Sequence, residues 1–503
     1  MNTLRSTRSV RREGSAAGFR KHECRLFAGV AAICICSDIV LPPGPGLAAG
    51  SLLYLTWAIW LTRREARAAL LTLNPVVSYQ IWQAAVLGVS PLYISLTNLG
   101  GTSVPLGNQH VSLEWVAYGH AIMVAGSCAF YAGMKRFQPN ESASECVPLA
   151  SASALHLAVA VLAGSVFLAA RASVTQYAGS TVAQLSFLPM AVLCMVATNQ
   201  RGARRRSANT RFWILLLGSL WLLLLNARGD SKMELILSFI PLLWWLLRMQ
   251  KHIRLLMVAA ALAALYLLVF APLVFAVRNN VYARDESGAL RVLSPNGTPD
   301  VLSGMLDAWS SGPEVYIQTW FDETMLRMCD PVATGLVASL VEEGGFLDGR
   351  GFDYLPISAV PRALWPQKPK INRGPYFSAV LGMATDPSLA TTSTGQTSAG
   401  ELYWNFGWSG MLLGMYLLGA SVSGLWWRAA GSDPRHGLLE MTAYTGAMLS
   451  FVLGTGAAAG PLFTTCVSAG IFWRVLIGLR GKAAKRQNNA VSDRRLQVPI
   501  HTC

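Results

Sequence analysis

The sequence has few charged residues, and this scarcity excludes an ordinary soluble fold. Only 13% of the 503 residues are charged, whereas 53% are hydrophobic, and soluble domains carry about 25% charged residues. The mean hydropathy is +0.40, and several apolar runs approach the roughly 20 residues that cross a bilayer. We therefore expect an all-α polytopic membrane protein.

Signatures of metal and disulfide sites are also missing. The sequence contains no Asp-x-Asp motif and no Cys-x-x-Cys pair at zinc spacing, so we expect no metal and no cofactor. Of the nine cysteines, only Cys329 falls in the longest polar segment, which leaves no disulfide framework there. Cys34-x-Cys36 lies in an apolar run, where cysteines behave as small hydrophobic residues.

The apolar runs predict about twelve membrane-spanning helices. A basic segment, residues 1–25, precedes the first run. A cleaved signal peptide is the alternative for this start, but the turn Pro42-Pro43-Gly44-Pro45-Gly46 leads directly into a second span and favours an uncleaved helix. The predicted spans are residues 26–41, 47–61, 76–97, 112–132, 155–170, 181–198, 212–226, 233–247, 255–277, 404–427, 438–454 and 461–479.

The positions of Lys and Arg predict the orientation of these spans. With the N-terminus in the cytoplasm and the spans alternating, 28 of the 41 basic residues fall in cytoplasmic segments, as the positive-inside rule requires. The tail, residues 480–503, then also lies in the cytoplasm. The net charge of +15 therefore faces anionic lipid, and we expect no nucleic-acid partner.

One long polar segment, residues 278–400, separates the ninth and tenth spans and is expected outside the cytoplasm. It holds nine basic and thirteen acidic residues, and loops of this length are usually functional. Two parts of it are predicted to be helical. They are Glu314–Arg327 and Pro331–Glu343, of which the second is apolar enough to re-enter or lie on the membrane.

Three outer segments carry cations suited to a phosphorylated ligand. Arg228 and Lys232 are four residues apart, so a helix beginning here would present both on one face. Arg278 directly follows the ninth span. A solvated turn and a flanking membrane anchor are the alternatives for these positions. The third group places cations and a tryptophan among prolines that fix the backbone: Arg362, Trp365, Lys368, Lys370 and Arg373.

These arginines suit a diphosphate ligand, because guanidinium is always charged and binds phosphate oxygens in pairs. At a membrane surface the natural diphosphate is a polyprenyl carrier. When a sugar leaves such a carrier, negative charge grows on the bridging oxygen, and one fixed cation there is worth roughly 3–4 kcal/mol. The cations therefore favour an enzyme acting on a lipid diphosphate.

Glu401 lies where the polar segment enters the tenth predicted span. An ionisable group at that depth is expensive unless it has a role or a partner. We expect it either to take the proton from an attacking sugar hydroxyl or to orient an arginine. Tyr403 and Asn405 follow it as candidate substrate-binding residues. Alternative bases in the outer segment are Asp322, Glu323, Glu342 and Glu343.

Asp38, near the outer end of the first predicted span, is a lone acid in an apolar run. We expect a structural role for it, because no second acid or base lies near it in the sequence. His110 and His120 lie in or near the fourth predicted span, and no histidine occurs in residues 278–400.

Two stretches resemble bacterial oligosaccharide repeat-unit polymerases of the Wzy type. One combines Pro361-Arg362, Trp365-Pro366 and Lys368-Pro369. The other is Gly400-Glu401-Leu402-Tyr403-Trp404-Asn405-Phe406-Gly407-Trp408-Ser409-Gly410. The Arg228 hairpin is similar to an Arg-Gly hairpin of the same group, and the resemblance covers roughly residues 210–430.

The resemblance implies a membrane glycosyltransferase of the GT-C-like branch that includes the O-antigen ligases. Such proteins join polyprenyl-diphosphate-linked oligosaccharides at the outer face of the bacterial inner membrane, for exopolysaccharide or O-antigen synthesis. It implies that Arg228, Arg278 and Arg362 bind the donor diphosphate, and that a chain-length regulator and a flippase act in the same pathway. An O-antigen ligase and a lipid-linked oligosaccharide flippase or transporter remain the alternatives, although ligases are expected to use an outer-loop histidine.

Overall fold

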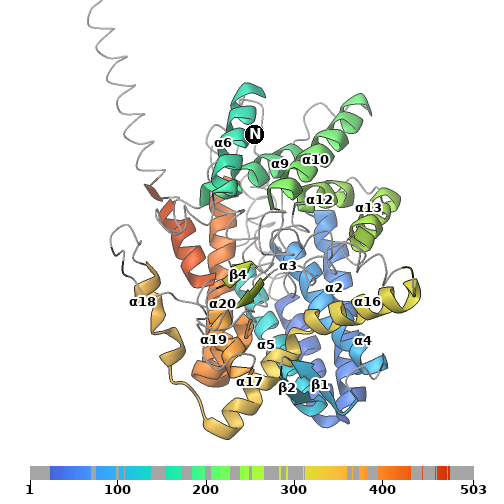
Figure 1. The fold of residues 1–503 in the computed structure, drawn as a ribbon, viewed down its shortest axis with the longest axis vertical. Helices are drawn as coiled ribbons and strands as arrows, with labels where there is room; N and C mark the ends of the chain where they lie inside the picture. The colour runs from blue at the N-terminus through green and yellow to red at the C-terminus, as the bar shows by residue number, and fades with distance from the viewer. Residues whose placement is uncertain are drawn as a thin grey trace, which may run out of the picture.

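The computed structural model is mostly helical (Figure 1). Short hairpins are its only described strands, so the all-α expectation is confirmed for the part of the chain that the structure describes. The structure describes residues 23–68, 75–97, 101–106, 108–136, 154–170, 184–198, 205–226, 238–248, 252–265, 282–284, 290–292, 310, 312–359, 365, 367, 373–382, 395–431, 445, 459, 462–472 and 474–475.

The described elements follow a first helix at residues 23–40. They are α2 (Pro43–Ala68), α3 (Pro75–Gln83), the π-helix η1 (Ala84–Val89), α4 (Ser90–Thr97), β1 (Ser103–Leu106), β2 (Gln109–Ser112), α5 (Leu113–Arg136), α6 (Ala154–Ala169), the 3₁₀ turn η4 (Gln184–Phe187), α9 (Leu188–Thr198), α10 (Arg205–Asn226), α12 (Ile240–Arg248), α13 (His252–Leu265), β3 (Tyr282–Arg284), β4 (Leu290–Val292), α16 (Pro313–Met328), α17 (Asp330–Gly344), the 3₁₀ turn η6 (Arg350–Phe352), α18 (Tyr354–Ala359), α19 (Arg373–Val380) and α20 (Ser398–Gly431). A last helix occupies residues 462–472.

In the described part of the chain, helices occupy the predicted apolar runs. The run at 76–97 is covered by α3, η1 and α4 in succession, and the run at 112–132 is α5. The two helices predicted inside the outer segment are also present, as α16 and α17. The predicted span at 438–454 lies outside the described residues except for position 445.

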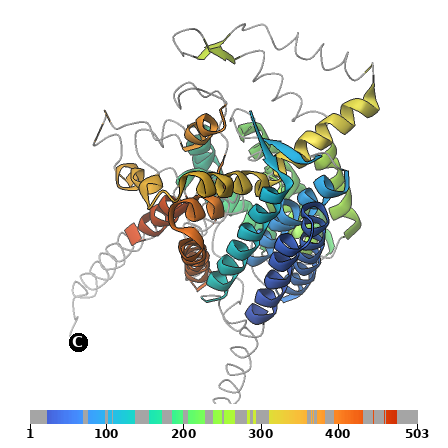
Figure 2. The same cartoon turned by 90° about the horizontal axis from the view of Figure 1, so that it is seen from below.

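The central helix is α5, which lies between the N-terminal helices and α20 (Figure 2). Three glycines recur on it at every seventh position: Gly119, Gly126 and Gly133. A heptad spacing keeps them on one stripe of the helix. A stripe without side chains lets neighbouring backbones approach closely, as small residues do between helices in membranes.

Both ends of this stripe are in backbone contact with a partner helix. A Cβ added at Gly119 would lie 2.4 Å from the Gly335 nitrogen of α17. At the other end, a Cβ at Gly133 would lie 2.1 Å from the Tyr416 carbonyl oxygen, and one at Gly419 would lie 2.1 Å from that of Phe130. The glycines therefore set how closely α17 and α20 pack on α5.

Side-chain contacts show that the N-terminal helices alternate in direction. Lys135 and Glu23 form a buried ion pair at 3.4 Å, while His120 and Asp38 pair at 2.7 Å near the opposite ends of the same two helices. The first helix therefore runs antiparallel to α5. α2 runs parallel to α5, because Gly50 lies against Asp38 and Tyr54, further along, bonds Ser127.

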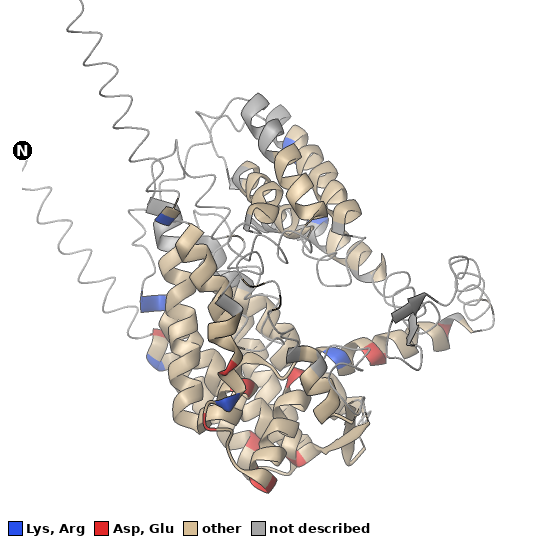
Figure 3. Ribbon diagram, turned by 60° about the vertical axis from the view of Figure 1, so that its left-hand side comes forward, with Lys and Arg blue, Asp and Glu red and all other residues tan. Residues whose placement is uncertain are grey.

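A second apolar cluster surrounds α9, α10 and α12. It includes Leu222 of α10, Trp245 of α12 and Leu425 near the end of α20, so α20 links this cluster to the one around α5. Lys, Arg, Asp and Glu are sparse along the described ribbons (Figure 3).

α17 is part of the core. All residues from Pro331 to Ala338 are buried, and Gly335 lies against the backbone of Trp115 on α5. Within the predicted outer segment 278–400, the stretch Pro331–Glu343 was expected to re-enter or lie on the membrane, and the structure packs it as a helix against α5. The signal for this was Gly335, a small residue in an apolar stretch.

By length and composition, one described helix is long and apolar enough to cross a membrane, namely Ser398–Leu425. The pair Glu314–Met328 and Asp330–Gly344, bent by 48°, raises the number to two if it forms one span. Several other described helices fall short of 18 residues, among them α6 with 16 and α13 with 14. Twelve spans are more than the described helices supply by this test.

We predict that Gly133→Ala destabilises the fold, because its new Cβ would clash with the Tyr416 carbonyl oxygen. Overpacking of this kind costs roughly 1–3 kcal/mol. The thermal unfolding of the purified full chain in detergent measures the effect. The control is Gly29→Ala in the first helix, whose Cβ would meet nothing within 4 Å and which should be neutral or slightly stabilising. Equal unfolding temperatures for the two variants would contradict close packing at this stripe.

Candidate functional site

α20 consists of two helices joined at a sharp bend. Gly407 has φ 63° and ψ −161°, a combination essentially restricted to glycine. Leu402 and Gly414 would be about 18 Å apart in a straight helix, yet Leu402 Cδ2 lies 2.6 Å from the Cβ position of Gly414. Residues 398–406 therefore fold back against the helix that follows. We call residues 395–406 the fold-back segment.

This bend revises both the membrane span and the position of Glu401. The helix that can cross a bilayer begins at Trp408, and the stretch 408–431 is long enough at about 1.5 Å per residue. The sequence placed Glu401 where a loop enters the span. The structure places it instead on the fold-back segment, where its exposure is 0%.

Neighbouring segments hold the bend. The Leu347 N–H donates to the Trp404 carbonyl at 2.9 Å, whose usual helical donor lies beyond the break. The Phe346 ring contacts Gly407 from the same side, 3.2 Å from its Cβ position. The short loop after α17 therefore supplies the hydrogen-bond donor that the Trp404 carbonyl loses at the bend.

Asn405 braces the fold-back segment. Its side-chain oxygen accepts the Gly351 N–H at 2.8 Å, and its Nδ2 donates to the Glu401 carbonyl at 2.8 Å. The residue is 1% exposed. Both polar atoms of this predicted substrate-binding residue thus bond to the protein itself, so it positions η6 and the segment.

The fold-back carries the start of the segment into the bundle. The Ala399 Cβ lies 3.2 Å from the Cβ position of Gly126, which is also 3.2 Å from the Met411 sulfur. Gly126 is in the middle of α5. Ala399 therefore reaches the middle of the central helix, and the three polar residues before it, Gln396, Thr397 and Ser398, are buried.

Thr397 begins this helix and ties it to α17. Its Oγ1 accepts the Gly400 N–H at 2.9 Å, which is the usual contact of a helix N-cap. The same hydroxyl shares a 2.8 Å hydrogen bond with Thr334 Oγ1. Thr397 has φ 57°, a conformation uncommon for residues other than glycine, so surrounding contacts hold this turn.

Gln396 is the least satisfied polar residue of the fold-back segment. It is 1% exposed, and neither its Oε1 nor its Nε2 has a hydrogen-bond partner in the described part of the chain. Leaving a buried polar group unpaired costs roughly 1–3 kcal/mol, so such a group indicates where a ligand or water binds. With Ser398 at 1% and Glu401 at 0% exposure, the segment gathers an amide, a hydroxyl and a carboxylate in the interior.

An aromatic cluster connects the fold-back segment and the bend to α5. Trp408 Nε1 donates to the Tyr118 hydroxyl at 3.2 Å, and that hydroxyl lies 3.4 Å from the Tyr403 hydroxyl. Tyr403, a predicted substrate-binding residue, is 6% exposed. Its ring also meets Phe346 at 5.9 Å in an edge arrangement. Trp408, a residue next to the bend, is thereby joined to α5.

Asp330 opens α17 close to this region. Its Oδ2 is buried without a hydrogen-bond partner among the described residues. The sequence did not mark Asp330 or Thr334 as site residues, since both lie in or beside an apolar stretch. Gln396 lies within the polar run that drew attention to this region.

The structure leaves most of the predicted cations untested. Trp365 is described and is 39% exposed. Arg373 begins α19, but its side chain is outside the described part. The remaining predicted cations lie outside the described residues, namely Arg228, Lys232, Arg278, Arg362, Lys368 and Lys370.

Two of the alternative carboxylates are engaged locally on α16. Asp322 accepts hydrogen bonds from the Tyr93 hydroxyl at 2.7 Å and from Gln318 at 2.8 Å. Glu323 pairs with Arg327 one turn away on the same helix. Neither contact places these acids beside the fold-back segment. Among the described residues, no three His, Cys, Asp or Glu side chains gather as a metal site would need.

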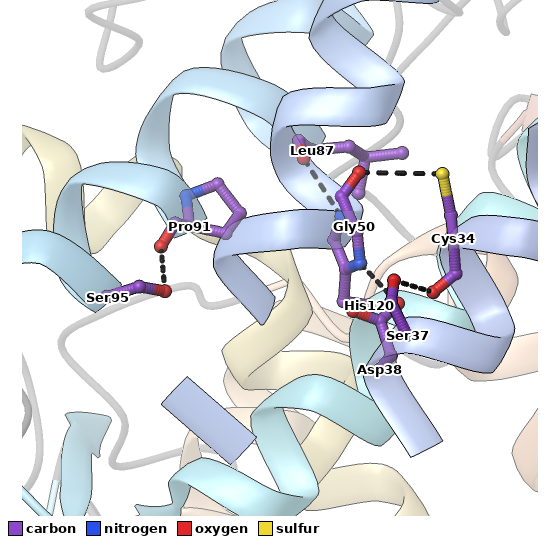
Figure 4. Close-up of polar contacts among 8 residues, drawn as sticks. All are labelled: Cys34, Ser37, Asp38, Gly50, Leu87, Pro91, Ser95 and His120. Carbon is purple, nitrogen blue, oxygen red and sulfur yellow. Dashed lines mark hydrogen bonds and ion pairs between the residues drawn. The ribbon is translucent and has the colours of Figure 1, made fainter. Parts of the chain in front are cut away.

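A second buried polar group lies among the N-terminal helices (Figure 4). Asp38, read from the sequence as a lone acid, pairs with His120 at 2.7 Å. Both side chains have 0% exposure. Because 82 residues separate the two in the chain, sequence spacing gave no sign of the pair.

Comparison with known proteins identifies no relative of this chain. No protein-family model, curated protein or solved structure matches the chain. Function is therefore inferred from the fold-back segment: a carboxylate, an unpaired amide and hydroxyls held inside a helical bundle beside aromatic rings.

Proposed function

We propose that the chain is a polytopic protein of the bacterial inner membrane, with about twelve spans and both termini in the cytoplasm. Large apolar side chains on the outside of α10 support this. Leu217 and Leu224 are 61% and 65% exposed, and Trp213 and Trp221 are 51% and 44% exposed. Such a wide apolar surface on one helix suits lipid contact, and the alternating directions of the N-terminal helices suit successive crossings.

Its proposed activity is that of a membrane glycosyltransferase that polymerises oligosaccharide repeat units carried on polyprenyl diphosphate. The observation that carries this proposal is Glu401, a fully buried carboxylate on the same segment as Gln396, whose amide has no partner among the described residues. A buried acid at bundle depth is expensive unless it has a role or a partner. Hydroxyl, amide and carboxylate groups next to aromatic rings are the groups that bind and activate a sugar.

In the proposed reaction, a hydroxyl of the acceptor sugar attacks the anomeric carbon of the donor. The new carbon–oxygen bond forms as the bond to the diphosphate oxygen breaks, so the configuration inverts. Glu401 takes the hydroxyl proton, and the bond electrons leave with the polyprenyl diphosphate. Arg228, Arg278 and Arg362 would neutralise that leaving charge, with Lys232, Lys368 and Arg373 assisting, so no metal is required. Trp365 and Tyr403 would contact sugar rings.

A transporter of lipid-linked oligosaccharides is the second candidate. The broken helix at Gly407 favours it, because discontinuous helices form the substrate sites of many secondary transporters. An O-antigen ligase, which would use the same donor and a different acceptor, is the third. The proposed polymerase extends a lipid-linked repeat unit, whereas a ligase transfers the glycan to lipid A core and a transporter forms no glycosidic bond.

We predict that Glu401→Gln abolishes polymer formation while the protein still accumulates in the membrane. The amide keeps the size of the side chain but cannot accept a proton, and loss of a general base costs about 10²–10⁴-fold in rate. Chain length is read on gels after supplying lipid-diphosphate repeat units to proteoliposomes. The control is Glu314→Gln, which changes an exposed carboxylate at the start of α16.

Wild-type chain lengths in Glu401→Gln would rule out Glu401 as the base. Products of single transfer to lipid A core would support the ligase, and translocation of intact donor without bond formation would support the transporter. Arg228→Ala and Arg362→Ala test the diphosphate contacts in the same assay and should also lose polymer.

A further inference from the structure

The His120 ring has a hydrogen-bond acceptor at each nitrogen (Figure 4). Its Nε2 lies 2.9 Å from the Leu87 carbonyl oxygen, and a carbonyl can only accept. Its Nδ1 lies 2.7 Å from the Asp38 carboxyl. Nε2 must therefore carry a hydrogen, and a second hydrogen must lie between Nδ1 and the carboxyl oxygen.

The Leu87 carbonyl can accept a hydrogen bond from His120 because a proline occupies the position of its usual helical donor. In an α-helix the carbonyl at position 87 would accept from the nitrogen at 91. That residue is Pro91, which has no N–H to donate. The chain is also wound as a π-helix over Ala84–Val89, a form that often marks functional sites. The Leu87 carbonyl therefore lacks its usual α-helical donor, and the His120 ring hydrogen-bonds to it from α5.

No other charged group described in the structure compensates this pair. The charges acting on Asp38 and His120 are those of each other. The Cys34 thiol, on the same helix as Asp38, is the one further titratable group that senses the carboxyl, and it donates to the Gly50 carbonyl at 3.5 Å. Among the residues described for α2 and η1, the neighbours are Gly50 and Leu87, which carry no charge.

Asp38 also has an oxygen that lacks a partner. Its Oδ1 is buried and unpaired within the described residues, and it lies 2.5 Å from the Cβ position of Gly50. Without the shared hydrogen, a bare carboxylate would face the lone pair of a neutral ring nitrogen. Two acceptors at 2.7 Å repel, so the contact between the first helix and α5 needs that proton.

We infer that Asp38, His120 and the Leu87 carbonyl form a proton-binding site that joins the first helix, α5 and η1. The ligand is a single proton, shared by the histidine and the carboxyl. When it is bound, the three segments are connected; when it is lost, Asp38 and His120 repel. The site is separate from the fold-back segment, and the inference does not rest on the proposed function.

The site predicts how the stability of the protein changes with pH, and in which direction. An unfolded histidine loses its proton near pH 6.5 and an unfolded aspartate near pH 3.9. Above pH 6.5 the folded wild type therefore binds one proton more than the unfolded chain, and its stability falls as pH rises. In Asp38→Asn, the amide donates to Nδ1 of a neutral histidine, so the folded state binds one proton fewer below pH 6.5 and stability rises with pH there.

The experiment compares the pH dependence of unfolding of the full chain, wild type and Asp38→Asn, in detergent. The unfolding temperature of wild type minus that of the variant should fall steadily from about pH 4.5 to pH 8.5, because each range contributes one proton in the same direction. One proton of difference changes the ratio of the two unfolding equilibrium constants, wild type to variant, about tenfold per pH unit. Ser95→Ala, which removes a hydroxyl bonded to the Pro91 carbonyl, is the control and should run parallel to wild type.

A constant difference between wild type and Asp38→Asn would overturn the inference. If the variant does not fold, nitrogen-15 spectra of histidine rings in the wild-type chain decide, with His120→Asn used to assign the signal. A protonated Nε2 with a hydrogen shared at Nδ1 is expected at pH 8. A neutral ring with a bare Nε2 would overturn the inference.

Discussion

Gly407 adopts backbone angles that only glycine tolerates, and the polar segment before it turns back into the bundle as a result. Asn405, Phe346 and Leu347 then fix the position of the turn. Any other residue at position 407 would be strained by these backbone angles. Its Cβ would also lie 3.2 Å from the Phe346 ring. The interior position of Glu401 and Gln396 therefore depends on one residue without a side chain.

The space that receives this segment is created by α5. Its glycine stripe lets α17 and α20 approach backbone to backbone at its two ends. Gly126 lies between those ends, and there the fold-back segment and the following helix both touch α5. Dispersion contacts at such short range stabilise the bundle, and they also leave little room for the buried polar groups to move away from one another.

Much of the helical architecture could be predicted from the sequence, because apolar runs and turn residues are local signals. α16 and α17 lie almost where the pattern predicted them. The hairpin of β1 and β2 was missed, although the dipeptide Gly-Asn at positions 107 and 108 of the sequence is a recognised hairpin signal. The bend at Gly407 was missed for a different reason. Its flanks are apolar and helical on both sides, so the pattern continues through the break.

Long-range pairs could not be predicted in the same way. His120 and Asp38 lie on separate helices, and only the packing of those helices brings them within 2.7 Å. Thr334 and Thr397 meet because α17 packs in the core. The apolar run predicted this helix, but not the residues that it contacts. Glu401 was identified from its unusual position in an apolar context, whereas its depth in the bundle follows from the bend.

The most direct test of the fold-back is a disulfide between Leu402→Cys and Gly414→Cys, formed in membranes containing the full chain and identified by mass spectrometry of the joined peptides. A disulfide needs Cβ atoms about 3.5–4.5 Å apart, whereas a continuous helix would hold these positions about 18 Å apart. The fold-back predicts that the disulfide forms readily. Its absence under conditions that oxidise other closely spaced pairs would show that α20 is straight and that Glu401 does not lie inside the bundle.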